Sequence, residues 1–144
     1  MSSWPEVVQR RNRLKKMAIS AMLATITACA SVDQGTPEQI VSRRSVERAA
    51  LLMRGDFEGA YKYSTPGYRS LESVGEYSAR WLGAPMWEEA SVARVDCQIE
   101  PTERCQIALA IKLRLPSAGL VTTHLQETWV WSGGQWYLFQ EVGL

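Results

Sequence analysis

The chain has 144 residues, of which 46% are hydrophobic and 22% charged, and its formal net charge is +1. This length suits a single domain. The charge is unevenly distributed: the first 28 residues carry five bases and one acid, whereas the other 116 carry 11 bases and 14 acids. Because most of the chain has no positive field to attract phosphates, we expect no nucleic-acid partner.

A basic stretch and a short apolar segment open the chain. Residues 10–16 read Arg-Arg-Asn-Arg-Leu-Lys-Lys, and residues 17–28 contain no charge. An apolar segment of 12 residues is too short to span a ~30 Å hydrocarbon core as a helix, which takes about 20 residues. A basic region, a short apolar core and small residues at its end are typical of a secretory signal.

The end of this segment, Ile26-Thr27-Ala28-Cys29, resembles the lipobox of bacterial lipoproteins. The resemblance implies cleavage before Cys29 and acylation of that residue, which would anchor the chain to a membrane. A plain signal peptide, or a buried hydrophobic helix with an incidental cysteine, is the alternative. In a Gram-negative cell, Ala30 after the cysteine would imply sorting to the outer membrane, with the domain facing the periplasm.

This interpretation divides the chain into three parts. Residues 1–28 are expected to be a lipoprotein signal peptide, residues 29–36 the lipidated cysteine and a short tether, and residues 37–144 the folded domain. The export route stays open. Arg10-Arg11 resembles a twin-arginine motif, but Arg13 stands where that motif usually has an aromatic residue, so the general secretory route is the alternative.

The other two cysteines, Cys97 and Cys105, form an even pair once Cys29 is set aside. They lie in a strand–turn–strand pattern centred on Pro101, so a hairpin would bring them opposite or nearly opposite each other. A disulfide is therefore predicted for an exported chain. Two buried thiols are the alternative, and a metal pair would lack further ligands because His124 is the only histidine.

Three helices are predicted before residue 85. Thr36-Pro37-Glu38-Gln39 combines an N-cap, a first-turn proline and a capping-box glutamine, which predicts a helix over 37–54. Asp56 caps a second helix over 57–63, which should stop at Thr65-Pro66-Gly67. Ser73 with Glu76 opens a third helix that reaches Gly83. The residues expected on the inner face of the first helix are Ile40, Val46, Ala49, Ala50 and Met53.

After Pro85 the sequence becomes β-branched and alternating. Strands are predicted at about 87–99, 104–115, 120–132 and 135–142, separated by turn residues. Helices followed by an antiparallel meander indicate an α+β fold, with the helices packed on one face of the sheet.

Three segments carry a resemblance to a known superfamily. Residues 55–61 (Gly-Asp-Phe-Glu-Gly-Ala-Tyr), 64–69 (Ser-Thr-Pro-Gly-Tyr-Arg) and 129–138 (Trp-Val-Trp-Ser-Gly-Gly-Gln-Trp-Tyr-Leu) are similar to the nuclear transport factor 2-like pattern. The resemblance, which covers roughly residues 37–142, implies a cone of three amino-terminal helices packed on a curved four-stranded antiparallel sheet. That fold hosts enzymes as well as structural domains, so it implies little about activity.

Few residues suit chemistry. His124 lies mid-strand and suits acid–base work by its pKa range, but an exposed strand histidine is commoner. Glu127 shares a strand face with Trp129 and Trp131 and could be an inward carboxylate, although a paired or rim position is the commoner arrangement. Trp81 joins these as a candidate lining of a ligand cavity, with core packing as the alternative. No catalytic residue, cofactor or metal is assigned.

These observations favour a non-enzymatic, membrane-anchored envelope lipoprotein. Its domain is expected to bind another protein, or a second copy of itself, through the sheet face. Binding of a small apolar ligand in the cone is the alternative, followed by an isomerase- or dehydratase-type enzyme.

Replacing Cys29 by serine is expected to abolish lipid attachment and membrane retention while leaving the domain folded, because serine offers no thiol for the diacylglycerol. Labelled palmitate incorporation and fractionation of cells measure the two effects. A serine variant that still carries the label would rule out Cys29 as the anchor.

Overall fold

The computed structural model describes residues 34–142. Four α-helices and a 3-10 helix precede four strands. Their bounds are α1 (Pro37–Met53), α2 (Phe57–Tyr61), α3 (Pro66–Leu71), α4 (Val74–Arg80), η1 (Ala84–Met86), β1 (Trp87–Gln98), β2 (Arg104–Leu115), β3 (Gly119–Ser132) and β4 (Gln135–Phe139). The predicted strand positions are confirmed to within a residue, except that β4 ends three residues earlier than expected. None of the helices in this part of the chain has the length and apolar character needed to cross a membrane.

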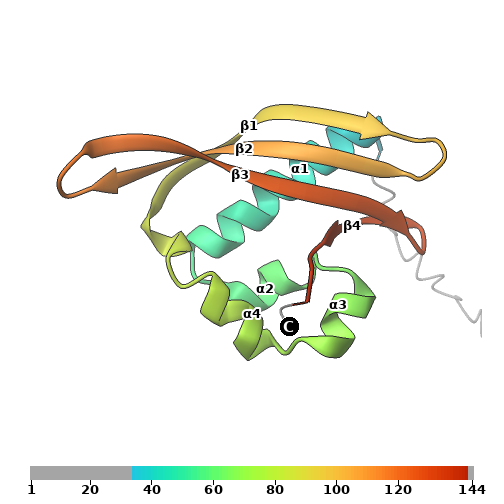
Figure 1. Ribbon diagram of the computed structural model, residues 1–144, viewed down its shortest axis with the longest axis horizontal. Coiled ribbons are helices and arrows are strands. Elements are labelled where there is room, and N and C mark those ends of the chain that lie inside the picture. The colour runs from blue at the N-terminus through green and yellow to red at the C-terminus, as the bar shows by residue number, and fades with distance from the viewer. Residues whose placement is uncertain (1–33, 143–144) are drawn as a thin grey trace, which may run out of the picture. The chain divides into compact units, whose positions relative to one another are not determined.

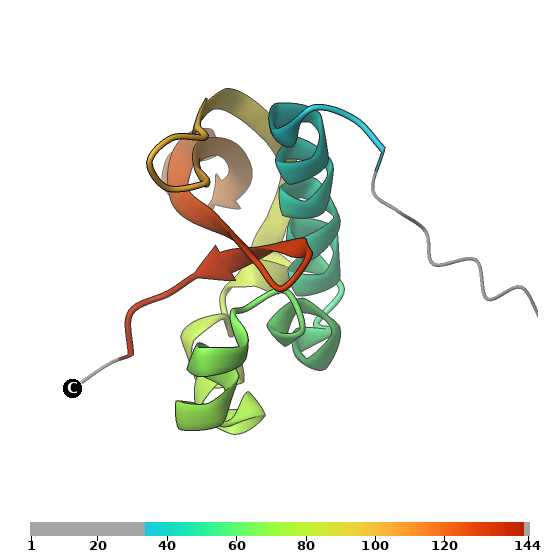
Figure 2. The same ribbon diagram turned by 90° about the vertical axis from the view of Figure 1, so that its right-hand side faces the viewer.

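The strands form one antiparallel sheet in the order β1-β2-β3-β4. Helix α1 lies along one face of the sheet and packs mainly beneath β1 and β2 (Figure 1). Helices α2, α3 and α4 gather at the β4 side, as both views show (Figure 2). There the backbone of Leu138 bonds to Tyr63 and Thr65, which covers the outer edge of β4. The opposite face of β1–β3, which we call the outer face, carries no helix.

The helix caps predicted from the sequence are present in the structure. Thr36 and Ser73 each form a complete capping box, with Gln39 and Glu76 respectively, and Asp56 accepts from the backbone N–H of Gly59. Such caps satisfy N–H groups that the first helical turn leaves without partners. The three predicted helix starts are therefore confirmed.

The expected fold class was wrong in its helices. The described residues form four α-helices and not three, because Thr65-Pro66-Gly67 begins α3 instead of ending the second helix. Thr65 Oγ1 accepts from the backbone N–H of Tyr68 at 3.2 Å, and Pro66 takes the first helical position. A threonine cap followed by proline also begins α1 at Thr36-Pro37, so the signal for α3 was present in the sequence.

The predicted inner face of α1 was also partly wrong. Val46 is 36% exposed, and Ala50 and Met53 are half-buried. The buried stripe instead includes two polar residues, Ser45 and Arg48, and its members are Ile40, Val41, Ser45, Arg48, Ala49 and Leu52. Apolar periodicity assumes that polar side chains face solvent. For α1 it therefore assigned the wrong set of residues to the core.

The predicted disulfide is present. Cys97 and Cys105 are direct partners in the β1–β2 ladder and are bonded to each other. Cys105 is fully buried in the core beneath the sheet, and Cys97 packs against that core. The bond therefore joins the two strands at the end that carries the β1–β2 turn.

Replacing Cys97 and Cys105 together by alanine is expected to lower the free energy of unfolding by about 2–3 kcal/mol, because a short closed loop restricts the unfolded chain. Urea unfolding of the chain without residues 1–29 measures the loss, and the reduced parent protein serves as a control that should show a similar loss. Equal stability of oxidised, reduced and double-alanine proteins would contradict this account.

Candidate functional site

Glu127, the inward carboxylate suggested by the sequence, lies buried between α1 and the sheet. Its Oε1 accepts from Arg48 Nη1 at 2.7 Å, and its Oε2 accepts from Trp129 Nε1 at 2.8 Å and from the Ser45 hydroxyl. The alternation of β3 turns Glu127 and Trp129 to the same inner face. Ser45 and Arg48 project from one face of α1 because they are three residues apart.

Arg48 links this carboxylate to the helices near β4. Its Nε donates to the hydroxyl of Tyr77 at 3.1 Å, and its guanidinium carbon lies 4.5 Å from the ring centroid of Trp81. Such a cation–π contact is strongest where water is excluded, and Arg48 is fully buried. Two buried N–H groups at this point, Arg48 Nη2 and Trp81 Nε1, have no partner among the described residues.

The network is suited to holding elements together and not to proton transfer. Both oxygens of Glu127 are occupied by donors, and the adjacent guanidinium neutralises its charge. Burial raises the pKa of the Tyr77 hydroxyl, although the charge of Arg48 acts in the opposite direction. Tyr77 therefore keeps its proton through the physiological range and offers no base.

The other candidate residues do not all lie at one site. Trp129 and Trp81 both join the network, through Glu127 and Arg48 respectively, whereas Trp131 is 40% exposed at the end of β3 and packs against Trp136. His124 is exposed on the outer face, opposite Ala110 of β2. Among residues 34–142, no group of three or more His, Cys, Asp or Glu side chains is placed to hold a metal ion.

Sequence reasoning missed Ser45 and Arg48. Their positions continue an apolar stripe, since Val41 precedes them by one turn and Leu52 follows by another, and all four are buried. A polar residue at such spacing between buried apolar ones is the signal that could have identified them.

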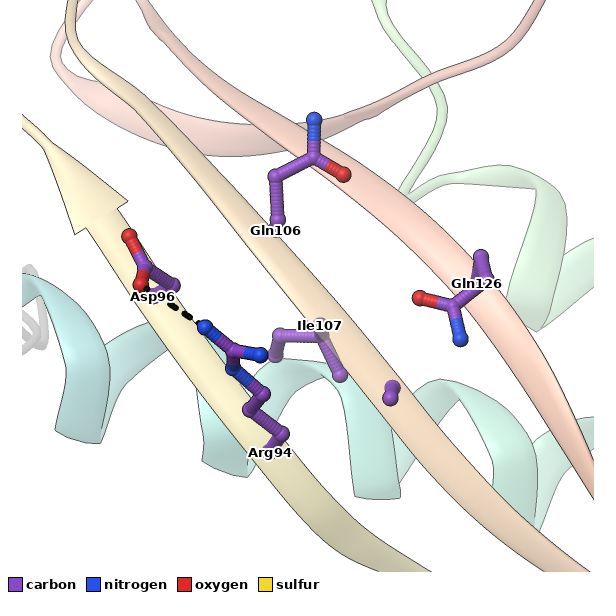
Figure 3. A pocket seen from close by; sticks show the side chains of 6 residues that line it. Arg94, Asp96, Gln106, Ile107 and Gln126 are labelled. Carbon is purple, nitrogen blue, oxygen red and sulfur yellow. Dashed lines mark hydrogen bonds and ion pairs between the residues drawn. The ribbon is translucent and has the colours of Figure 1, made fainter.

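Two hollows lie on the outer face of the sheet. The first has a volume of about 250 Å³ (Figure 3). Its lining includes Ala108, which pairs with Arg94 on β1 and Gln126 on β3. Because alanine is short, the longer side chains around it form a rim, which Asp96 and Gln106 complete. This rim offers amide and guanidinium donors together with amide and carboxylate acceptors.

The second hollow has a volume of about 450 Å³ and lies beside the β1–β2 turn. It combines apolar surface with one cation, and its lining residues are Gln98, Pro101, Thr102, Arg104, Val130 and Phe139. Both hollows therefore occur on the face that α1 leaves uncovered.

Comparison with known proteins identifies a fold and no family. No family model matches the chain, and no curated protein matches its sequence. The chain is similar to the solution structure of a SEC-C motif containing protein from Rhodopseudomonas palustris, with a TM-score of 0.52 and 17% identity over 74% of this chain and 79% of that one. The likeness concerns the fold alone. Together with the helix count, it overturns the expected fold class of three amino-terminal helices packed as a cone on the sheet.

Replacing Arg48 by methionine is expected to destabilise the domain by about 3–5 kcal/mol, because it leaves the Glu127 carboxylate buried without a counter-charge. Replacing Glu127 by leucine should have a comparable effect. The double variant should be clearly more stable than the sum of the two losses implies, since it removes both charges. Urea unfolding of the four proteins measures this coupling, and strictly additive losses would contradict a direct pair.

Proposed function

We propose that this chain is an exported, lipid-anchored envelope protein whose domain binds a partner protein through the outer face of the sheet. The observation that carries the proposal is the contrast between the two faces. The inner face is packed against α1, and its carboxylate is neutralised by Arg48. The outer face carries two hollows lined by side chains from different strands.

The chemistry of the first hollow suits a polypeptide. Gln106 and Gln126 carry amide groups that both donate and accept, so they match the N–H and C=O groups of a peptide backbone. Arg94 pairs with Asp96 at 3.4 Å, and both side chains are largely exposed. An exposed pair of this kind exchanges partners at little cost, because solvent screens it.

The position of the domain in the chain favours a partner at the membrane. With lipid on Cys29 and α1 beginning at Pro37, the connecting residues reach at most ~28 Å when extended. The domain would then stay close to the lipid surface, where its partner has to be accessible.

The interior offers less to a ligand or substrate. The cluster between α1 and the sheet is filled by side chains such as Trp129, Ile107 and Leu109, all essentially inaccessible to solvent. Catalysis by Glu127 is disfavoured since each of its oxygens accepts a hydrogen bond from a buried donor. We therefore put the binding surface outside.

A photo-reactive amino acid at Gln126 tests the proposal in cells that express the intact chain. Irradiation is expected to give a discrete adduct with a protein, because this side chain borders the first hollow. The same substitution at Lys62, which is exposed just after α2 and lines neither hollow, should give no such adduct.

The adduct should also disappear when Ala108 is replaced by arginine, which fills the hollow without touching the core. Equal labelling from Gln126 and Lys62, or labelling that survives Ala108→Arg, would argue against a specific surface at this position.

A further inference from the structure

The second hollow contains a cation with no carboxylate partner. Arg104 opens β2 and is exposed, and it forms no ion pair with any residue in 34–142. The other basic side chains of the outer face each lie within 3.4 Å of a carboxylate, and these pairs are Arg94–Asp96, Lys112–Glu89 and Arg114–Glu88. The hollow therefore has an unmatched positive charge, unlike the rest of the face.

Apolar walls stand beside this charge. The guanidinium carbon of Arg104 lies 6.0 Å from the ring centroid of Phe139, and Val130 is its direct partner on β3. Phe139 is 43% exposed, so its ring is accessible to a binding partner. A carboxylate next to an aliphatic side chain is the chemistry that such a hollow would bind.

The chain presents that chemistry next to the hollow. The β1–β2 turn carries Ile99 and Glu100 side by side, both exposed, with Ile99 at 43%. The turn projects beyond the end of the sheet, so it is accessible to another molecule (Figure 1). Pro101 and Thr102 of the same turn form one side of the hollow, so the two features adjoin.

We propose that this hollow receives the β1–β2 turn of a second copy of the chain. Glu100 of one copy would pair with Arg104 of the other, and Ile99 would pack against Phe139 and Val130. Because turn and hollow adjoin, a two-fold axis between them makes both contacts at once, as an isologous interface requires. The inference rests on the proposed function, since it names a partner for one end of the outer face.

The dimer should be weak in solution. The proposed contact joins one turn to one hollow, whereas a stable interface typically buries ~1,600 Å² of surface. The lipid anchor on each copy would confine both copies to one membrane surface and raise their effective concentration. A weak contact is then favoured without any additional contacts between the two copies. The test therefore belongs in the membrane, with the intact chain.

A photo-reactive amino acid at Thr102, in chains that carry two different tags, reports copy-to-copy contact directly. We expect a cross-linked dimer that contains both tags. Arg104→Glu alone and Glu100→Arg alone should each reduce the yield by ~10-fold or more, because each places like charges opposite one another. Co-expression of these two variants should restore the mixed pair, since both contacts then join opposite charges. Arg114→Glu, a change at the other end of β2, should leave the yield unchanged.

Several outcomes would overturn the dimer. These are the absence of a mixed-tag adduct at Thr102, an undiminished yield in either single variant, and the failure of co-expression to restore it. An adduct of Gln126 with a different protein, without copy-to-copy contact at Thr102, would overturn the dimer and leave the proposed function standing. Circular dichroism of each variant confirms that the fold is retained.

Discussion

The buried ion pair between Arg48 and Glu127 is the interaction on which the arrangement of this domain depends. It joins the middle of α1 to the middle of β3, and Tyr77 and Trp81 extend it toward α4 and η1. Each charge would be costly in the interior alone, so the pair is stable only where both partners and their hydrogen bonds meet. The network thereby selects one position of the helix on the sheet.

This constraint divides the two faces of the sheet by function. On the inner face, the carboxylate of Glu127 is bonded to side chains of α1, and Ile107, Leu109 and Ile111 fill the remaining space. On the outer face the same strands present side chains that no element of the described chain covers. Recognition is therefore free to use the outer face without disturbing the core, because alternate residues of one strand serve the two purposes.

The disulfide has a related role at the end of the sheet. By joining Cys97 to Cys105 it holds the base of the β1–β2 turn, which carries Glu100, next to the hollow that contains Arg104. A turn held in this way loses less conformational entropy when it contacts another molecule. Stability and the proposed contact are thus linked through one covalent bond.

Much of the domain could be predicted from the sequence, because the signals are local. Caps at Thr36, Asp56 and Ser73 mark helix starts, alternation marks the strands, and the spacing around Pro101 pairs the cysteines. The start of α3 at Thr65-Pro66 was also encoded locally, although it was mistaken for a stop. The lipid on Cys29 stays a prediction, since that residue lies outside the described part of the chain.

Only the tertiary structure decided which polar residues of α1 face inward. Ser45 and Arg48 are buried because both donate hydrogen bonds to Glu127, which lies 82 and 79 residues further along the chain. Neither helical periodicity nor strand alternation carries that information, because each describes a single element. A charged side chain can be buried in a core only when an opposite charge from another element lies beside it. The sequence by itself determined the strands and most of the helices, and it brought the two cysteines of β1 and β2 opposite each other. The pairing of distant charges decided how α1 packs on the sheet and which face of the sheet was left uncovered.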